Sequence, residues 1–310
     1  MSNPTRQLHL NAFLLGVGHH LAAWRHPDAR TSVTLDHYKD LARTAERGKF
    51  DALFFADYLG VAPAPARLLA QSALSLSSFF EPITLLSVLS TVTERLGLIG
   101  TVSTTYDSPF HLARRFASLD RLSGGRSGWN LVTSATDAEA KNFGLDGQIA
   151  HADRYARARE YVELVRELWD SWEDDAFIFD KEEARVFVPE KLHVPNHQGK
   201  YFSVAGPLNV ERPVQGYPVL IQAGSSADGQ ELAAATAEIV FTAQPTLQEA
   251  QRFYRGLKAL LPKFGRQPED LLILPGVSPY IGRTEEEARE KFESLQALIP
   301  PEVGVGLLSA

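Results

Sequence analysis

The sequence predicts an α/β protein built as a (β/α) TIM barrel, and three observations support that prediction. Short apolar runs alternate with helical patterns along all 310 residues. Seven such runs occur without a break between domains, which favours a barrel over an open sheet. The stretch 96–134 reads as strand, helix, strand, with polar residues at the ends of both strands. We therefore expect a parallel sheet within one domain over residues 1–310.

Each expected strand is a short apolar run bounded by polar or turn residues. Leu98 and Ile99 make one run apolar enough to be buried on both faces, and Trp129 and Leu131 do the same in the next. The seven expected strands are 8–14, 52–56, 96–104, 127–133, 219–223, 238–243 and 271–281.

Helical periodicity fills the intervals between these strands. Ser108 and Pro109 can open a helix that ends at Gly124. In 151–172, apolar residues recur every three or four positions opposite a face rich in arginine and glutamate. Two further helix starts show the spacing of a capping box, Thr246 with Glu249 and Thr284 with Glu287.

Two segments depart from the alternation. The stretch 173–217 is rich in Asp, Glu, Pro, His and Gly. We interpret it as an insertion at the mouth of the barrel, where long loops usually serve binding. After the helix that starts near Thr284, the chain ends without an eighth strand or a final helix. Because a closed barrel of this type has eight strands, we expect a barrel that is incomplete at its C-terminus.

Composition excludes several classes of protein. The chain has no cysteine, which excludes disulfides, thiolate nucleophiles and cysteine-ligated metal sites. A formal net charge of -7 argues against nucleic acid as a partner. No apolar run approaches the roughly 20 residues of a membrane span, and no signal-peptide pattern opens the chain. A soluble, cytoplasmic protein without a membrane partner is therefore expected.

Polar side chains gather where the parallel strands would end, which is where such folds bind ligands. Asp57 follows the second expected strand, although a structural turn or cap is its alternative role. Neutral hydroxyls and an amide follow the third and fourth strands, and they suit a large heteroaromatic cofactor better than a metal. These residues are Thr101, Ser103, Thr104, Thr105, Asn130, Thr133 and Ser134.

The segment after 219–223 is typical of a phosphate site. Ser225 and Ser226, among glycines, precede a helix whose first backbone amides could hold a phosphate monoester. The alternative is an ordinary serine cap with a glycine turn. His151 and Tyr155 lie four residues apart on one helix face and could reach the same phosphate or a ring edge. A capping histidine and a core tyrosine are the other interpretation.

Three histidines, His19, His20 and His26, fall in a loop after the first expected strand. They lack the ligand spacing and partner carboxylate of a zinc site, so no metal is expected. Histidine titrates near neutrality, which favours proton transfer or hydrogen bonding to a substrate.

Characteristic blocks of residues are spread along the whole chain in a fixed order: NAF with GHH and WRHP, FDALFFAD, STTYDSP with ARR and LDRLS, WNLVTS with NFG, HADRY, GPLNVERP and QAGSSADG. Together they resemble the bacterial luciferase-like superfamily, and within it the nitrilotriacetate and dibenzothiophene-sulfone monooxygenase branch. The resemblance implies a (β/α)8 barrel and a flavin-dependent, two-component monooxygenase. Such an enzyme takes reduced FMN from a separate NAD(P)H:flavin reductase and uses dioxygen to oxygenate a small organosulfur or amine-type substrate. A homo-oligomer is also implied.

The resemblance also implies roles for individual residues. Asp57 and Thr101 would contact the flavin ring, and Asn130 and Ser134 would make further cofactor or pocket contacts. His19 or His20 would act near the reacting centre. Family members continue well beyond the point that matches the end of this chain. The phosphate and ribityl binders implied by the resemblance would be His151, Tyr155, Ser225 and Ser226.

Two alternatives stay open: a deazaflavin-dependent hydride-transfer enzyme of the same fold, and a catalytically inactive, truncated member.

Overall fold

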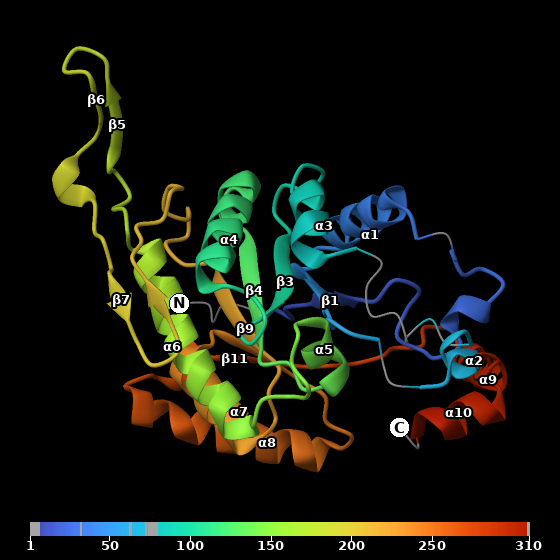
Figure 1. Cartoon of the computed structure of the whole chain (residues 1–310). Coiled ribbons are helices and arrows are strands. Elements are labelled where there is room, and N and C mark those ends of the chain that lie inside the picture. The colour runs from blue at the N-terminus through green and yellow to red at the C-terminus, as the bar shows by residue number, and fades with distance from the viewer. Residues whose placement is uncertain (1–6, 32, 62–63, 72, 74–79, 309–310) are drawn as a thin grey trace, which may run out of the picture.

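The computed structural model describes residues 7–31, 33–61, 64–71, 73 and 80–308. Its centre is a seven-stranded sheet in which every neighbouring pair of strands is parallel (Figure 1). All seven expected strands are confirmed, and they are neighbours in chain order. They are β1 (Asn11–Leu14), β2 (Ala52–Phe55), β3 (Gly97–Ser103), β4 (Ser127–Val132), β9 (Val219–Gln222), β10 (Ile239–Thr242) and β11 (Leu272–Pro275).

Alternate residues of each strand pack on opposite faces of this sheet. In β2, Leu53 and Phe55 join the main core cluster, which includes residues of the surrounding helices, whereas Ala52 and Phe54 belong to a second cluster. The sheet is curled, because the rings of Phe13 in β1 and Phe241 in β10 lie 5.4 Å apart although four strands separate them. Among the described residues β1 and β11 remain edges, so the sheet forms an open half-barrel.

The last strand is shorter than expected. The sequence predicts a strand over 271–281, but β11 ends at Pro275. Among the described strands β11 pairs with β10 alone, and β10 ends at Thr242, so no described strand lies beside the backbone that follows. Val277 and Ile281 are accordingly exposed, and their apolar side chains misled the prediction.

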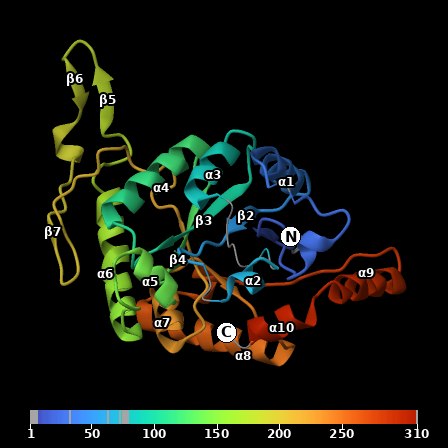
Figure 2. The ribbon, with the colours of Figure 1, turned by 45° about the vertical axis from the view of Figure 1, so that its right-hand side comes forward.

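Helices cover the outer face of the sheet (Figures 1 and 2). Gly124, in the left-handed conformation at φ 66°, ends α4 as expected, and Ser108 stands at its N-cap without a side-chain capping bond. The helices are α1 (Leu35–Arg47), α2 (Ala66–Leu69), α3 (Pro82–Leu89), α4 (Pro109–Ser123), α5 (Asp137–Asn142), α6 (His151–Trp169), α7 (Ala227–Thr236), α8 (Leu247–Leu260), α9 (Glu285–Ala297) and α10 (Pro301–Leu308), with 3-10 turns at Ala23–Arg25, Pro189–Lys191, Leu261–Phe264 and Pro268–Asp270.

The helix α10 corrects the expectation that the chain ends without a final helix. Pro301 occupies its first turn, Glu302 follows it, and Val303 is fully buried. Gly304 and Gly306 interrupt the apolar pattern, which is why the sequence reads as a tail. The close approach of Gly306 to Leu68 shows that α10 packs beside α2 (Figure 2).

The stretch 173–217 does not lie at the mouth of the barrel, so that expectation is wrong. It follows α6, which returns from the carboxyl ends of the strands to their amino ends. Near its end, the backbone N–H and side-chain amide of Gln215 donate to the Asp120 carboxylate, and the amide also donates to the carbonyl of Ser127 at the start of β4. The segment contains β5 (Phe177–Asp180) and β6 (Arg185–Phe187), which project from the body (Figure 1), and β7 (His197–Gln198) and β8 (Ser203–Val204).

Both expected helix starts are confirmed at α8 and α9, with the threonine half of each capping box present. The hydroxyl of Thr246 accepts a hydrogen bond from the backbone N–H of Glu249, and Thr284 does the same for Glu287. We expect Thr246→Ala to lower the free energy of unfolding by about 1 kcal/mol, because it leaves a helix N–H without its acceptor. Urea denaturation measures the change, and Ser118→Ala in the middle of α4 should alter stability by less. An equal loss in both variants would contradict the capping role.

No helix in the described part of the chain is both long and apolar enough to cross a membrane.

Candidate active site

A cavity of about 310 Å³ lies among the carboxyl ends of the strands. That volume falls in the range of small-molecule sites. One wall is aromatic and is formed by Phe13, Phe54 and Phe241, whose rings contact one another. The polar side chains of the lining, here called the polar wall, include Asp57, Thr101, Asn130, Ser134, Glu139 and Tyr155.

The polar wall leaves one hydrogen-bond acceptor unused. Thr101 Oγ1 donates to the carbonyl of Phe55 at 2.7 Å, so it accepts from Asn130 Nδ2 at 2.9 Å. This chain of hydrogen bonds fixes the orientation of the Asn130 amide. Asn130 Oδ1 is buried and has no hydrogen-bond partner among the described residues. A buried acceptor left unpaired is costly, so the wall is suited to a ligand that brings an N–H donor.

Ser134 sits at a strained turn that leads from β4 to α5. Its φ of 53° lies in the left-handed region, which serine rarely adopts. Its hydroxyl donates to Glu139 Oε1 at 2.9 Å, and its carbonyl accepts from the buried Arg154. Burial would raise the pKa of Glu139, but hydrogen bonds from Ala135, Ser134 and Thr136 bring it below the ordinary value. Glu139 is therefore an ionised anchor of this turn.

Asp57 behaves differently from Glu139. It follows β2 and is half-buried at the polar wall. Burial raises its pKa to about 6, and the nearby charges of Glu81 and Glu139 add to that rise, while a hydrogen bond from the backbone of Tyr58 opposes it. The carboxyl of Asp57 therefore titrates near neutral pH.

At one end the cavity borders the start of α7. Gly224 lines the cavity, and a Cβ there would lie 3.0 Å from the Cα of Gly229, so the turn requires glycine. Ser226 is the N-cap of α7: its Oγ accepts from Gly229 N at 3.1 Å and lies 3.5 Å from the hydroxyl of Tyr155. The ring of His151 is 4.7 Å from that of Tyr155. Helix N–H groups, two hydroxyls and an imidazole thus converge here, as an anionic group requires.

The family described as luciferase-like monooxygenase matches residues 17–304. The chain belongs to this family. It is 53% identical over 310 residues to the N-acetyl-S-(2-succino)cysteine monooxygenase of Bacillus subtilis (strain 168), covering 99% of this chain and 69% of that protein. It is 47% identical over 311 residues to nitrilotriacetate monooxygenase component A of Aminobacter aminovorans, covering 98% of this chain and 69% of that protein.

A solved structure of the same fold contains a flavin. It is a riboflavin lyase with modified FMN and riboflavin, with which the chain shares 34% identity and a TM-score of 0.91 over 97% of this chain and 69% of that one. The predicted superfamily and branch are confirmed by these relatives, and so is the predicted enzyme class, a luciferase-like monooxygenase.

In this luciferase-like monooxygenase, five of the ten predicted site residues line the cavity. They are Asp57, Thr101, Asn130, Ser134 and Tyr155. His151 and Ser226 lie beside Tyr155 at the start of α7. Ser225 is exposed in the same turn, where its carbonyl accepts from Gln230. The roles implied for all of these residues stay predictions.

The two histidines predicted near the reacting centre are not part of the described cavity wall. His19 is exposed: its Nε2 lies 2.9 Å from the carbonyl of Phe13, and its ring stands against the Phe13 ring. His20 uses both ring nitrogens, one with the backbone N–H of Ala22 and the other with Gln296 of α9. Of the two, His19 is the closer to the cavity, because it packs on a residue of the aromatic wall.

Sequence reasoning missed Glu139 and Phe54. Thr136 and Glu139 have the same capping-box spacing that identified two other helix starts, and the box is present at the start of α5. That signal could have located Glu139 at a helix start beside the end of β4. Phe54 lies within an apolar run, and only the face of β2 that it occupies makes it part of the site.

Proposed function

We propose that the chain is the oxygenating component of a two-component monooxygenase that uses reduced FMN and dioxygen. A separate NAD(P)H:flavin reductase supplies the reduced FMN, as the name of the nitrilotriacetate relative, component A, suggests. The observation that carries the proposal is Asn130 Oδ1, which is buried and has no partner in the described part of the chain. It lies in the wall of a cavity that borders the N-terminus of α7.

The residues present fit the ring of a flavin. A flavin ring is planar and apolar on its faces, and its edge carries an imide N–H between two carbonyl groups. The aromatic wall suits the faces, and Asn130 Oδ1 offers the acceptor that the imide N–H needs. Thr101 supports that acceptor by fixing the amide. Asp57 and Ser134 complete the polar wall as the proposed contacts to the ring and the pocket.

The residues at the start of α7 fit a phosphate monoester. The N-terminus of a helix favours an anion through its free N–H groups and its dipole. Ser226 and Tyr155 supply hydroxyls and His151 a ring nitrogen, while the exposed Ser225 stands in the same turn. Asp228 lies 3.0 Å from His151 Nδ1 and so fixes the orientation of the imidazole beside Tyr155.

Reduced FMN supplies the electrons that activate dioxygen, and the protein supplies orientation and exclusion of water. Phe13, Phe54 and Phe241 make an apolar surface on which water is poorly held. The hydrogen bonds from Thr101 to Phe55 and from Asn130 to Thr101 fix the Asn130 amide, which would orient the ring. His19 or His20 is the proposed partner of the substrate, and a small organosulfur or amine-type compound is the proposed substrate. A homo-oligomer stays a prediction.

Binding of FMN against riboflavin tests this proposal, because the two differ only in the phosphate. We expect the chain to bind FMN at least about tenfold more tightly, a difference of about 1.4 kcal/mol. Ser226→Ala should narrow the preference several-fold by weakening FMN binding alone. Flavin fluorescence or equilibrium dialysis measures both affinities.

Thr246→Ala is the matched control, since it removes a threonine cap from α8 away from the cavity. It should leave both affinities unchanged. Equal affinity for FMN and riboflavin would contradict the phosphate site, and absence of any flavin binding would contradict the proposed function. Preference for a deazaflavin cofactor would instead support hydride transfer.

A further inference from the structure

Two carboxyl groups, Asp57 and Glu139, line the cavity, and the charge of a third, Glu81, acts on Asp57. Asp57 follows β2, Glu81 is the N-cap of α3, and Glu139 belongs to α5. The charge of Glu139 acts on Asp57 as well. Tyr58 is its neighbour in the chain, and Tyr155 lies in the cavity wall. Negative charges near a carboxyl group favour its protonated form.

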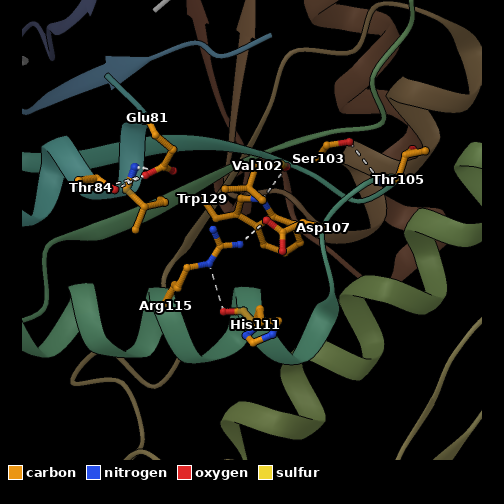
Figure 3. Close-up of polar contacts among 10 residues, drawn as sticks. Glu81, Thr84, Val102, Ser103, Thr105, Asp107, His111, Arg115 and Trp129 are labelled. Carbon is orange, nitrogen blue, oxygen red and sulfur yellow. Dashed lines mark hydrogen bonds and ion pairs between the residues drawn. The ribbon is translucent and has the colours of Figure 1, made fainter. Parts of the chain in front are cut away.

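Hydrogen bonds fix the positions of the Glu81 and Glu139 carboxyl groups, and they lower the pKa of Glu139. Glu81 accepts from the backbone N–H of Ile83 at 3.0 Å and from both the N–H and the hydroxyl of Thr84 at 2.7 Å (Figure 3). Glu139 accepts from the N–H groups of Ala135 and Thr136 and from the hydroxyls of Ser134 and Thr136, at 2.9 to 3.1 Å. Donors that point at a carboxylate favour its charged form, so Glu139 is not the group that takes the proton.

Asp57 is the carboxyl group on which the two neighbouring charges act, so it is the candidate to take up a proton. Its carboxylate accepts from the backbone of Tyr58. Among the residues that the structure describes, no lysine, arginine or histidine forms an ion pair with it. Water in the cavity therefore contributes much of the stabilisation of its charge. A ring that fills the cavity displaces this water and leaves Glu81 and Glu139 in place, which penalises the charged form further.

We propose that filling the cavity with the flavin ring protonates Asp57, so that Asp57 holds a proton at the cavity wall. This inference rests on the proposed function. One proton from solvent joins the carboxylate as the ring binds. Affinity for the ring and protonation of Asp57 are then linked, and binding weakens wherever the free protein has already lost that proton.

The proton has a use in the proposed reaction. Transfer of one atom of dioxygen to a substrate consumes the two electrons and one hydrogen of the reduced-flavin anion. One further proton is needed to release the other oxygen atom as water. Asp57 lines the described cavity and His19 and His20 do not, so the geometry points to Asp57 as the group that holds this proton.

The test is an anaerobic titration of the full chain with reduced FMN across the neutral pH range, together with calorimetry in two buffers that report proton uptake. We expect the affinity of the unchanged protein to fall by up to about tenfold per pH unit above about pH 6. The affinity of Asp57→Asn for reduced FMN should stay the same above about pH 6 as below it. This variant should also take up about one proton fewer on binding than the unchanged protein. Titration of the FMN itself is the same in both proteins, so the difference between them isolates Asp57.

Asp28→Asn is the matched control, because the Asp28 side chain is 94% exposed in a surface loop. It should reproduce the profile of the unchanged protein. Asp57→Ser is a second neutral variant, and its affinity for reduced FMN should likewise not fall above about pH 6. It replaces Asp57→Asn in the test if the asparagine variant does not fold. If both neutral variants retain the original pH profile and proton uptake, the proposal is wrong while the proposed function stands. Failure of the unchanged protein to bind reduced FMN at every pH would contradict both.

Discussion

Replacing Trp129 by alanine lowers the free energy of unfolding by about 3 to 5 kcal/mol, the largest effect on stability that we expect from a single substitution. Trp129 is fully buried in β4 and packs against Phe116 of α4 and Tyr161 of α6. Its indole N–H donates to the carbonyl of Val102 at 3.1 Å (Figure 3). The substitution leaves a cavity between the sheet and two helices, and an acceptor without its donor.

Urea denaturation of the variant measures this loss. Trp129→Phe is the comparison, because it keeps most of the buried ring and removes only the indole N–H. It should cost about 1 to 2 kcal/mol, mainly for the unpaired carbonyl of Val102. A loss in Trp129→Ala no greater than in Trp129→Phe would show that packing by Trp129 does not hold the sheet to α4 and α6.

Asn130→Leu should weaken the binding of FMN by about ten- to a hundredfold, equivalent to about 1.4 to 3 kcal/mol. Leucine is similar in size to asparagine but offers no acceptor to a ligand N–H. The same change removes a buried acceptor that has no partner in the described structure, so the empty protein should be as stable as before or more stable. Opposite signs for binding and stability distinguish a ligand-binding residue from a packing residue.

Equilibrium dialysis and thermal melting of the same preparations test both parts of this prediction. Asn209→Leu, at an exposed position of the 205–217 loop, is the control and should change the affinity for FMN less than threefold, about 0.6 kcal/mol. If Asn130→Leu binds FMN as tightly as the unchanged protein, Asn130 Oδ1 is not the acceptor for the flavin, and the proposed function loses its main support.

The location of the insertion was predictable in principle. Loops that follow strands form the mouth of a parallel barrel, whereas a loop that follows a helix lies at the amino ends of the strands. The stretch 173–217 follows α6, and Gln215 is anchored at the start of β4. Its unusual length suggested binding, but its position in the order of elements decides its place.

The sequence determined the seven strands, their parallel order, the main helix caps and the family. These features depend on local patterns. The apolar side chains of 127–132 predict a buried strand, and a threonine three residues before a glutamate predicts a helix N-cap.

The tertiary structure decided which polar groups face the cavity and which hydrogen-bonding atom of each is left for a ligand. Among the described residues Asn130 Oδ1 is unpaired because Thr101 fixes the other end of the amide. The pKa of Asp57 is raised to about 6 first by its burial and further by the charges of Glu81 and Glu139. Such properties arise between residues distant in the chain, so no single segment contains them.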